Sequence, residues 1–254
     1  MIKLKSVTLS YPGATAVEKL TGAFKSNTMT AIIGPNGGGK SSLIKGIMGI
    51  LPLDSGEIKF QTIRQKELAY LPQQSRVDRT FPLNVFDVVS MGLSQKQGFF
   101  RKINQTDLIE ATLEKVGLQG YKDKSIQALS GGQFQKVLFA RLWLQEAKVI
   151  LLDEPFTGID RHTTEDIIQI LKMWVEEGKT IIAVLHHFDL VRDHFPETLL
   201  LARRLIAWGE TKTVLTRENL EKAIEQSRFW ESGTESSDLA SQTSLLAVPT
   251  LEDS

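Results

Sequence analysis

A short apolar segment, a glycine-rich loop and an apolar-periodic segment follow one another near the N-terminus. Residues 29–33 have the length and composition of a buried strand, and the pattern over about 40–50 predicts a helix. A strand that runs through a loop into a helix directs backbone N–H groups and the helix dipole at one spot. The loop carries the spacing G-x-x-x-x-G-K-[ST], which predicts a phosphate-binding site. We call its residues the phosphate loop: Gly34, Pro35, Asn36, Gly37, Gly38, Gly39, Lys40 and Ser41.

The side chains of the phosphate loop have specific predicted roles. Lys40 would neutralise the β- and γ-phosphates of a nucleoside triphosphate, and the Ser41 hydroxyl would ligate Mg²⁺. The adjacent Ser42 is predicted to belong to the same nucleotide-binding set. The alternative is a glycine-rich turn with a solvent-facing lysine, which the flanking strand and helix disfavour. The motif alone would suit a kinase or a GTPase equally well.

Two acids follow a second apolar segment. Residues 149–152 are four apolar residues in a row, and Asp153 and Glu154 come directly after them. The C-terminal end of a buried parallel strand opens into a site, so Asp153 would hold Mg²⁺ and Glu154 would accept a proton from an attacking water. A loop start or a helix cap is the alternative for two such acids taken alone. Combined with the phosphate loop, they predict hydrolysis rather than binding only.

The rest of the chain alternates apolar strands with helical patterns. This alternation predicts an α/β fold with a mainly parallel sheet covered on both faces. Residues 2–10 and 16–25 alternate apolar and polar side chains and are predicted strands of an antiparallel β subdomain. Helical spacing over 83–93 and 105–116 predicts an α-helical subdomain inserted at about 74–133. The predicted domain spans 1–231, and the Ser- and Thr-rich residues 232–254 are predicted to be a flexible tail.

Composition restricts the partners. Thirty Lys and Arg balance thirty Asp and Glu, so we expect no nucleic-acid partner. The absence of cysteine removes any disulfide framework, thiolate zinc site or thiol nucleophile. The N-terminus lacks the apolar segment of a signal peptide, and no run of about 18 uncharged apolar residues occurs. If the protein serves a membrane process, something else spans the bilayer.

Between the two motifs lies the sequence LSGGQ, residues 129–133, which we call the signature loop. Here the chain resembles the ABC ATPase family, and the resemblance implies a P-loop NTPase (RecA-like) core with ATP and Mg²⁺ as cofactors. The resemblance extends over about residues 1–215. The alternative for these residues is a serine that caps a helix after a turn. The resemblance implies nucleotide contacts from Ser130, Gly131, Gly132 and Gln133.

The resemblance also implies roles for residues outside the three motifs. Tyr11 matches the aromatic residue that stacks on adenine, although a surface tyrosine in a turn is the alternative. Gln73, rather than Gln74, matches a glutamine that contacts Mg²⁺ and the attacking water. Asp160 matches an acid that follows the catalytic glutamate in the family. His186 lies 32 residues beyond Glu154, where the family places a histidine that contacts the γ-phosphate. His187 then stands where an aspartate is usual.

The family's division of labour implies a dimer. In ABC ATPases the signature loop of one subunit closes on the nucleotide that the other subunit holds. One cassette in this chain therefore implies a homodimer, or a pair with a close relative. We expect a monomer that binds ATP and hydrolyses it poorly, and closure of the pair on ATP would be the mechanical step.

Residues 71–93 are similar to a segment of zinc and manganese uptake cassettes. The resemblance implies a peripheral protein on the cytoplasmic face of the inner or plasma membrane. Its partners would be an integral membrane permease, docked at Phe81, Pro82 and the helix that follows them, and indirectly an extracytoplasmic metal-binding protein. The sequence LLLARRLIAWGE resembles the zinc-linked members in particular, so zinc is the first expectation and manganese the second. The alternatives are a transporter for another substrate and a non-transport scaffold or regulatory clamp.

Overall fold

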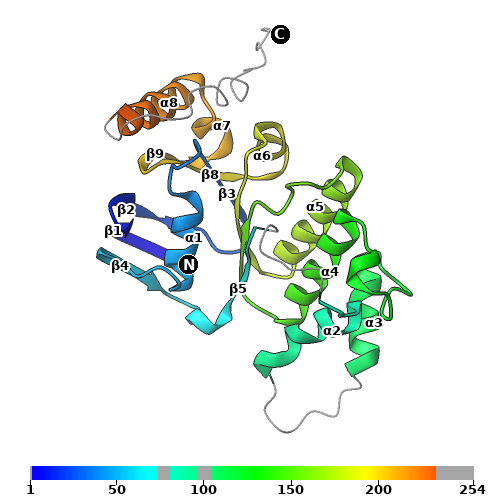
Figure 1. Ribbon diagram of the computed structural model, residues 1–254. Coiled ribbons are helices and arrows are strands. Elements are labelled where there is room, and N and C mark those ends of the chain that lie inside the picture. Colours follow the sequence, from blue (N-terminus) through cyan, green and yellow to red (C-terminus); the bar gives the residue numbers. More distant parts are fainter. Residues whose placement is uncertain (1, 74–80, 97–104, 233–254) are drawn as a thin grey trace.

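The computed structural model describes residues 2–73, 81–96 and 105–232 of the chain (Figure 1). Within these residues, the main sheet has the strand order β5-β6-β7-β3-β8-β9. Neighbouring strands are parallel except for the last pair, β8 and β9. The strands are β3 (Met29–Ile33), β5 (Leu68–Leu71), β6 (Val149–Asp153), β7 (Thr180–Val184), β8 (Glu197–Ala202) and β9 (Arg204–Glu210).

Apolar side chains on both faces of this sheet are buried, so its central strands are continuous apolar runs. In β3, Ala31 and Ile33 join one hydrophobic cluster while Ile32 joins the other. Successive side chains of a strand point to opposite faces, so one short strand contributes to both cores. This explains why every residue of β3, β6 and β7 is buried. The sheet is covered on both sides, as a parallel sheet must be.

One face carries a second, antiparallel sheet of order β2-β1-β4 together with helix α1. The elements are β1 (Ile2–Tyr11), β2 (Ala14–Phe24), α1 (Lys40–Met48) and β4 (Ser55–Phe60). In Figure 1 these elements lie on the side of the main sheet away from α5. Edge-to-face contact between Phe24 and Trp208 joins β2 to β9.

The other face is covered by helices. Helices α2, α3 and α4 pack on one another at the far end of the molecule in Figure 1, and α4 and α5 connect them to the sheet. The helices are α2 (Val85–Ser90), α3 (Gln105–Lys115), α4 (Gly131–Leu144), α5 (Arg161–Glu176) and α6 (Phe188–His194). Short 3-10 turns are η1 (Gln65–Glu67), η3 (Met91–Lys96) and η4 (Ile126–Ala128). Helices α7 (Thr211–Val214) and α8 (Arg217–Ser232) follow the last strand.

The structure confirms the predicted fold class: an α/β core with a mainly parallel sheet, an antiparallel β subdomain and an inserted helical part. Some boundaries differ from the prediction. The predicted helix over 83–93 is a short α-helix followed by a 3-10 turn, and α4 begins at Gly131 because Ser130 caps it there. The sequence pattern did not predict α8. The limits of the inserted subdomain and of the tail stay predictions, since 74–80 and 233–254 lie outside the described residues.

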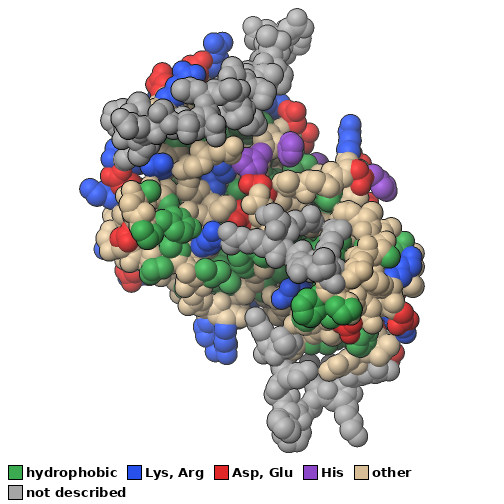
Figure 2. All heavy atoms as spheres, viewed as in Figure 1, with side chains coloured by type: hydrophobic (Ala, Val, Ile, Leu, Met, Phe, Trp, Pro, Cys, Tyr) green, Lys and Arg blue, Asp and Glu red, His purple; other side chains and the backbone are tan. Residues whose placement is uncertain are grey.

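Within the described ranges, none of the helices combines the length and the apolar composition needed to cross a bilayer. Figure 2 shows Lys and Arg side chains scattered among acidic ones over the face that it presents, without a single basic stripe.

Candidate nucleotide-binding site

The phosphate loop leaves the C-terminal end of β3 and is supported from behind by β8. Gly34 has φ 144°, and a Cβ atom there would lie 1.9 Å from the carbonyl oxygen of Leu201. A Cβ on Gly38 would lie 2.9 Å from the same oxygen. The loop can therefore take this shape only with glycine at position 34, because other side chains rarely adopt that φ and the space is already filled.

Lys40 begins α1 and turns back across the loop. Its Nζ atom donates to the carbonyl oxygens of Gly34 at 2.9 Å and Pro35 at 2.7 Å. The residue is only 6% exposed. Burial lowers the pKa of the Lys40 ammonium to about 8, while the nearby carboxylates of Glu154 and Asp153 act in the opposite direction. A buried cation is thus held above the loop, where an anion would stabilise it.

Asp153 stands at the end of β6 with both carboxylate oxygens engaged. The Ser41 hydroxyl donates to Oδ1 at 2.7 Å, and the Tyr70 hydroxyl donates to Oδ2 at 3.3 Å. Burial raises the pKa of the Asp153 carboxyl and the neighbouring Glu154 charge adds to this, against the hydrogen bonds from Ser41 and Tyr70. The structure therefore brings Ser41 and Asp153 together, as the sequence predicted for two motifs that are far apart in the chain.

Glu154 is the centre of a second polar cluster. Its Oε2 accepts hydrogen bonds from Gln73 Nε2 at 2.8 Å and Thr157 Oγ1 at 3.3 Å, and its Oε1 lies 2.6 Å from His186 Nε2. The backbone of Glu154 has φ 52°, a left-handed conformation that non-glycine residues seldom adopt and that is common at functional sites. Gln73 and His186, which are distant from Glu154 in the sequence, therefore meet on its carboxylate. In Figure 2, histidine and acidic side chains lie beside one another near the middle of the face shown.

A pocket of about 320 Å³ opens over the phosphate loop. Glu154, His186 and Tyr11, which is 42% exposed, line it together with residues of the phosphate loop. Its lining residues are Tyr11, Ala14, Thr15, Ala16, Asn36, Gly37, Gly38, Gly39, Lys40, Ser41, Ser42, Glu154, His186 and Arg203. Ten of these are predicted nucleotide-site residues, and Gln73 and Asp153 are hydrogen-bonded to members of the set.

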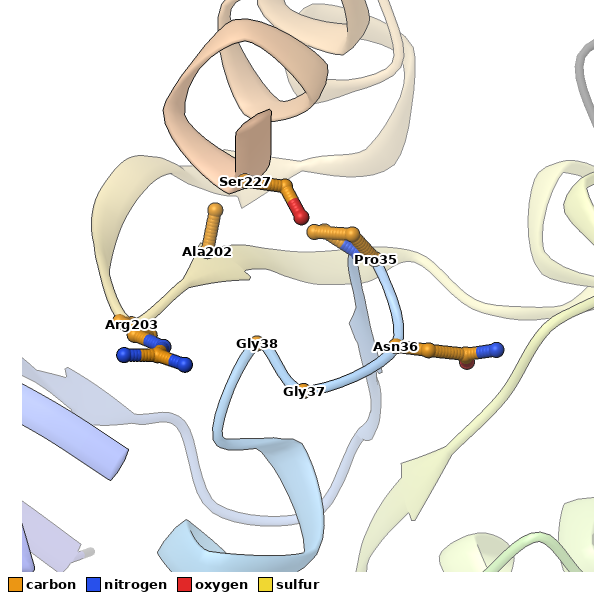
Figure 3. A pocket seen from close by; sticks show the side chains of 7 residues that line it. All are labelled: Pro35, Asn36, Gly37, Gly38, Ala202, Arg203 and Ser227. Atoms are coloured by element: carbon orange, nitrogen blue, oxygen red, sulfur yellow. The ribbon is translucent and has the colours of Figure 1, made fainter. Parts of the chain in front are cut away.

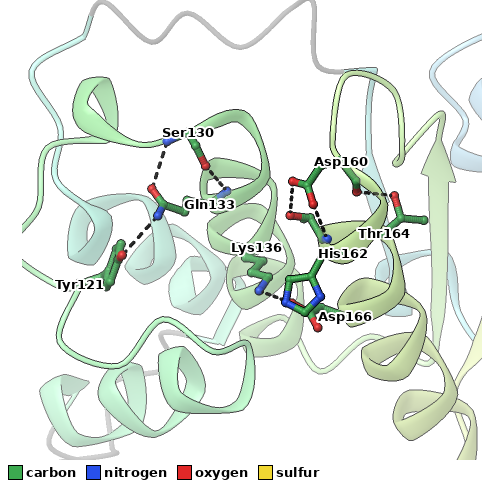
Figure 4. A network of polar contacts seen from close by, with 9 residues as sticks. Tyr121, Ser130, Gln133, Lys136, Asp160, His162, Thr164 and Asp166 are labelled. Atoms are coloured by element: carbon green, nitrogen blue, oxygen red, sulfur yellow. Dashed lines mark hydrogen bonds and ion pairs between the residues drawn. The ribbon is translucent and has the colours of Figure 1, made fainter.

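The signature loop lies outside this pocket. None of the described residues that line it comes from 129–133, and Asp160 does not line it either. Ser130 and Gln133 instead cap each other at the start of α4, with side chain to backbone N–H distances of 3.2 and 3.1 Å (Figure 4). Asp160 caps the start of α5 by accepting from the backbone N–H of Thr163 at 2.9 Å, and this lowers the pKa of the Asp160 carboxyl.

The two helix starts are in close contact. A Cβ on Gly132 would lie 2.5 Å from the Thr163 hydroxyl oxygen, and that hydroxyl donates to Asp160 at 2.7 Å. Lys136 of α4 forms an ion pair with Asp166 of α5 at 2.6 Å, also shown in Figure 4. The signature loop and Asp160 are therefore connected through Thr163, and none of these residues lines the pocket of the same chain.

Other predicted positions differ in their surroundings. His187 is exposed and precedes α6, where its side chain makes no capping hydrogen bond. Phe81 is 64% exposed, and Pro82 beside it is also exposed. Gln74 lies outside the described residues.

Sequence reasoning missed six residues of the site, among them Ala14, Thr15 and Ala16, which line the pocket. Tyr70 and Thr157 donate to the two acids, and Arg203 lines the pocket. The position of Thr157, three residues after Glu154, was a local signal that could have indicated a contact. Tyr70 and Arg203 depend on the order of strands in the sheet, which the sequence pattern does not reveal.

The phosphate loop follows the buried strand β3, Asp153 ends β6 two strands away in the sheet, and a pocket opens over the loop; together they define a P-loop nucleotide hydrolase. Residues 17–157 match the family model described as ABC transporter. Over 228 residues the chain is 37% identical to the manganese transport system ATP-binding protein MntB of Listeria monocytogenes, which covers 87% of this chain and 95% of that protein. The chain belongs to the ABC transporter family and is one of its ATP-hydrolysing, ATP-binding subunits.

Two further comparisons agree. The zinc transport system ATP-binding protein TroB of Treponema pallidum is 38% identical over 229 residues, which cover 87% of this chain and 86% of that protein. Among solved structures, cbiO1 from Clostridium perfringens, part of the ABC transporter complex cbiONQ, superposes with a TM-score of 0.73. It is 27% identical and covers 88% of this chain and 94% of that chain.

Proposed function

We propose that two copies of this chain hydrolyse ATP between them and energise the import of a divalent metal ion, zinc or manganese, through a separate membrane permease. The observation that carries the proposal is the division of the site. Residues of the phosphate loop and Glu154 line the pocket, while the signature loop lies outside it with its own capping contacts. A second copy would supply the missing side of the site.

The pocket suits ATP in size and chemistry. Tyr11 is exposed at one edge and would stack on the adenine ring, while Lys40 would exchange its two carbonyl partners for phosphate oxygens. The backbone N–H groups at the start of α1 would complete the phosphate contacts together with Ser41 and Ser42.

The residues present fit Mg²⁺. The Ser41 hydroxyl and the Asp153 carboxylate are already side by side, and Gln73 lies one hydrogen bond away on Glu154. The described residues include no cluster of three His, Asp or Glu side chains that could cage a metal. That matches Mg²⁺, which takes few protein ligands and completes its shell with water and substrate phosphates. When bound, the ion would neutralise charge that develops on the phosphates.

Glu154 would orient and deprotonate the attacking water. Its two oxygens are held in position by Gln73, Thr157 and His186, which fixes the direction of its free lone pairs. His186 would turn from Glu154 to the γ-phosphate once nucleotide enters. Asp160 and the signature loop would act on the nucleotide of the other copy.

The manganese and zinc transport proteins that this chain resembles support the metal ion as cargo. The exposed Phe81 and Pro82, which precede α2, offer apolar side chains for a coupling segment of the permease. A protein docked there would lie peripherally on the cytoplasmic face of the membrane. An extracytoplasmic metal-binding protein would deliver the ion to the permease.

The dimer is tested with Glu154→Gln. Removing the base should stop turnover and leave an ATP-bound closed pair, so gel filtration with ATP and Mg²⁺ should show a shift from monomer to dimer. Glu154→Gln with ADP is the matched control and should stay monomeric. A monomer in both conditions would overturn the divided site.

The cargo is tested with the chain reconstituted beside its permease and binding protein in vesicles. ATP hydrolysis should rise when the binding protein is loaded with zinc or manganese, and comparison of the two ions would assign the metal. A rate that ignores both metals would favour another substrate or a scaffold role.

A further inference from the structure

The turn between β8 and β9 joins the phosphate loop to β2. The backbone N–H of Arg203 donates to the carbonyl oxygen of Gly38 at 2.8 Å, and the carbonyl of Arg203 accepts from the N–H of Glu18 at 2.8 Å. Arg204 forms two hydrogen bonds to the Glu18 carboxylate, at 2.9 and 2.7 Å. The turn is therefore fixed on both sides, and Arg203 is held directly against the phosphate loop.

The backbone of Arg203 is in an unfavourable conformation. Its φ is 60°, in the left-handed region where glycine or asparagine would be the residues at least steric cost. Strained non-glycine residues concentrate at functional sites, where the surrounding structure holds them. The turn therefore carries an arginine where glycine would have the least steric cost.

The side chain borders the nucleotide pocket. Among the described residues that line the pocket, Lys40 is the lysine and Arg203 is the arginine. The two lie far apart in the sequence. Figure 3 shows Arg203 beside Gly38, on the far side of the loop from Asn36. A smaller space of about 60 Å³, lined by both Arg203 and Ser227 of α8, lies behind the same loop.

The two cations differ in what they can reach. Lys40 donates to the Gly34 and Pro35 carbonyls, whereas Arg203 is attached to Gly38 through its backbone N–H and lines the pocket together with Gly37 and Gly38. ATP carries several negative charges, and a guanidinium offers planar, paired donors that match phosphate oxygens.

We propose that Arg203 binds the polyphosphate of the nucleotide, as a second cation that complements Lys40. The proposal rests on the pocket that we assign to ATP. The guanidinium would approach the phosphates from the β8–β9 turn and contribute to affinity for ATP and ADP, without contacting the base. The hydrogen bond between the turn and Gly38 would keep the guanidinium at a fixed position relative to the phosphate loop.

The test compares Arg203→Gln and Arg203→Gly with the wild type. Dissociation constants for ATP, ADP and adenosine are measured by calorimetry or competition on the whole chain, with urea unfolding of the ligand-free protein beside them. Both variants should bind ATP and ADP about tenfold more weakly and adenosine unchanged. Arg203→Gly should do so without loss of stability, because glycine accepts the positive φ.

Arg204→Gln is the matched control on the same turn. It loses the pair with Glu18 but carries no predicted phosphate contact, so its affinities should stay close to those of the wild type. Unchanged ATP affinity in both Arg203 variants, or an equal loss for adenosine, would overturn the proposal. Failure of the assigned pocket has a different outcome: Lys40→Ala would then bind ATP as well as the wild type does.

Discussion

Helices α1 and α4 both begin at glycine-containing turns, but their first turns are occupied differently. The residue before α1 is Gly39, with φ 88° and no side-chain cap, and the lysine that follows it is buried. The residue before α4 is Ser130, whose hydroxyl and backbone N–H are both engaged with Gln133. At the start of α1 the backbone N–H groups have no side-chain cap and are available to a ligand in the pocket. At the start of α4 the Ser130 side chain already accepts a hydrogen bond from one such N–H group.

The first turn of any helix carries N–H groups without intrahelical partners, and these attract anions. At α1 a loop of glycines and a cation gather around the same groups, so one copy of the chain can bind phosphate there. At α4 a ligand must compete with the serine cap, and the pocket of the same chain is elsewhere. A glycine-rich helix start is therefore an anion site only when its surroundings leave the donors available.

The largest contrast between the two loops is expected from alanine in place of glycine. Gly34→Ala should lower the free energy of unfolding by about 4 kcal/mol or more, because its Cβ would overlap the Leu201 carbonyl at an unfavourable φ. Gly131→Ala meets only the Gly158 carbonyl, at 3.3 Å, and should cost less than about 1 kcal/mol. Urea unfolding of both variants measures the difference. Equal losses would contradict the contrast.

Removing a lysine from each region should affect nucleotide affinity unequally. Lys40→Ala should weaken ATP binding about 100-fold, since a buried charged donor faces the loop. Lys136→Ala, which breaks the pair with Asp166 beside α4, should change it by about twofold at most. Titration of each isolated variant with ATP gives both numbers, and a large effect from Lys136 would mean that the signature loop shares the pocket of its own chain.

Affinity at the phosphate loop should depend on pH. The Lys40 ammonium has a pKa of about 8 in the ligand-free protein, so it is mostly charged below that pH and mostly neutral above it. Phosphate favours the charged form, so the affinity for ADP should fall to about half its full value at pH 8 and be about tenfold weaker at pH 9. Calorimetry between pH 7.5 and 9 measures this. Lys40→Arg is the control, and its affinity should be independent of pH over the same range.

The smallest effect is expected at the cap of α4. Ser130→Ala should lower stability by about 1 kcal/mol through loss of the N-cap, with unchanged ATP affinity of the monomer and reduced hydrolysis by the pair. Unfolding, titration and steady-state ATPase rates give the three readouts. Weaker ATP binding by the isolated monomer would place Ser130 at the nucleotide of its own chain.

The core of the fold could be predicted because its signals are local. The apolar runs of β3, β6 and β7 mark buried strands, and the loop motif after β3 is contiguous. The strand order could not be predicted, because a continuous apolar run says that a strand is buried but not which strands lie beside it. Helix α8 was not predicted because its sequence lacks a clear apolar pattern: it is rich in charged residues and carries few large apolar side chains.

The residues of the site likewise fall into those that local motifs predict and those that depend on strand order. Lys40, Ser41 and the two acids follow from their motifs and the chemistry of phosphate transfer, whereas Gln73 and His186 were expected only from the resemblance to a family. The convergence of these two residues on Glu154 requires β5, β6 and β7 to be neighbours in that order. Tyr70 and Arg203 reach the site by the same route, from strand pairing that no local pattern encodes.

The position of β3 between β7 and β8 has a consequence during synthesis on the ribosome. The phosphate loop lies within the first 41 residues, yet the carbonyl that shapes it belongs to Leu201, and both strands that flank β3 are made late. A nascent chain therefore carries the loop sequence without the support that folds it until β7 and β8 have been made. Nucleotide can assist folding only after Leu201 has left the exit tunnel.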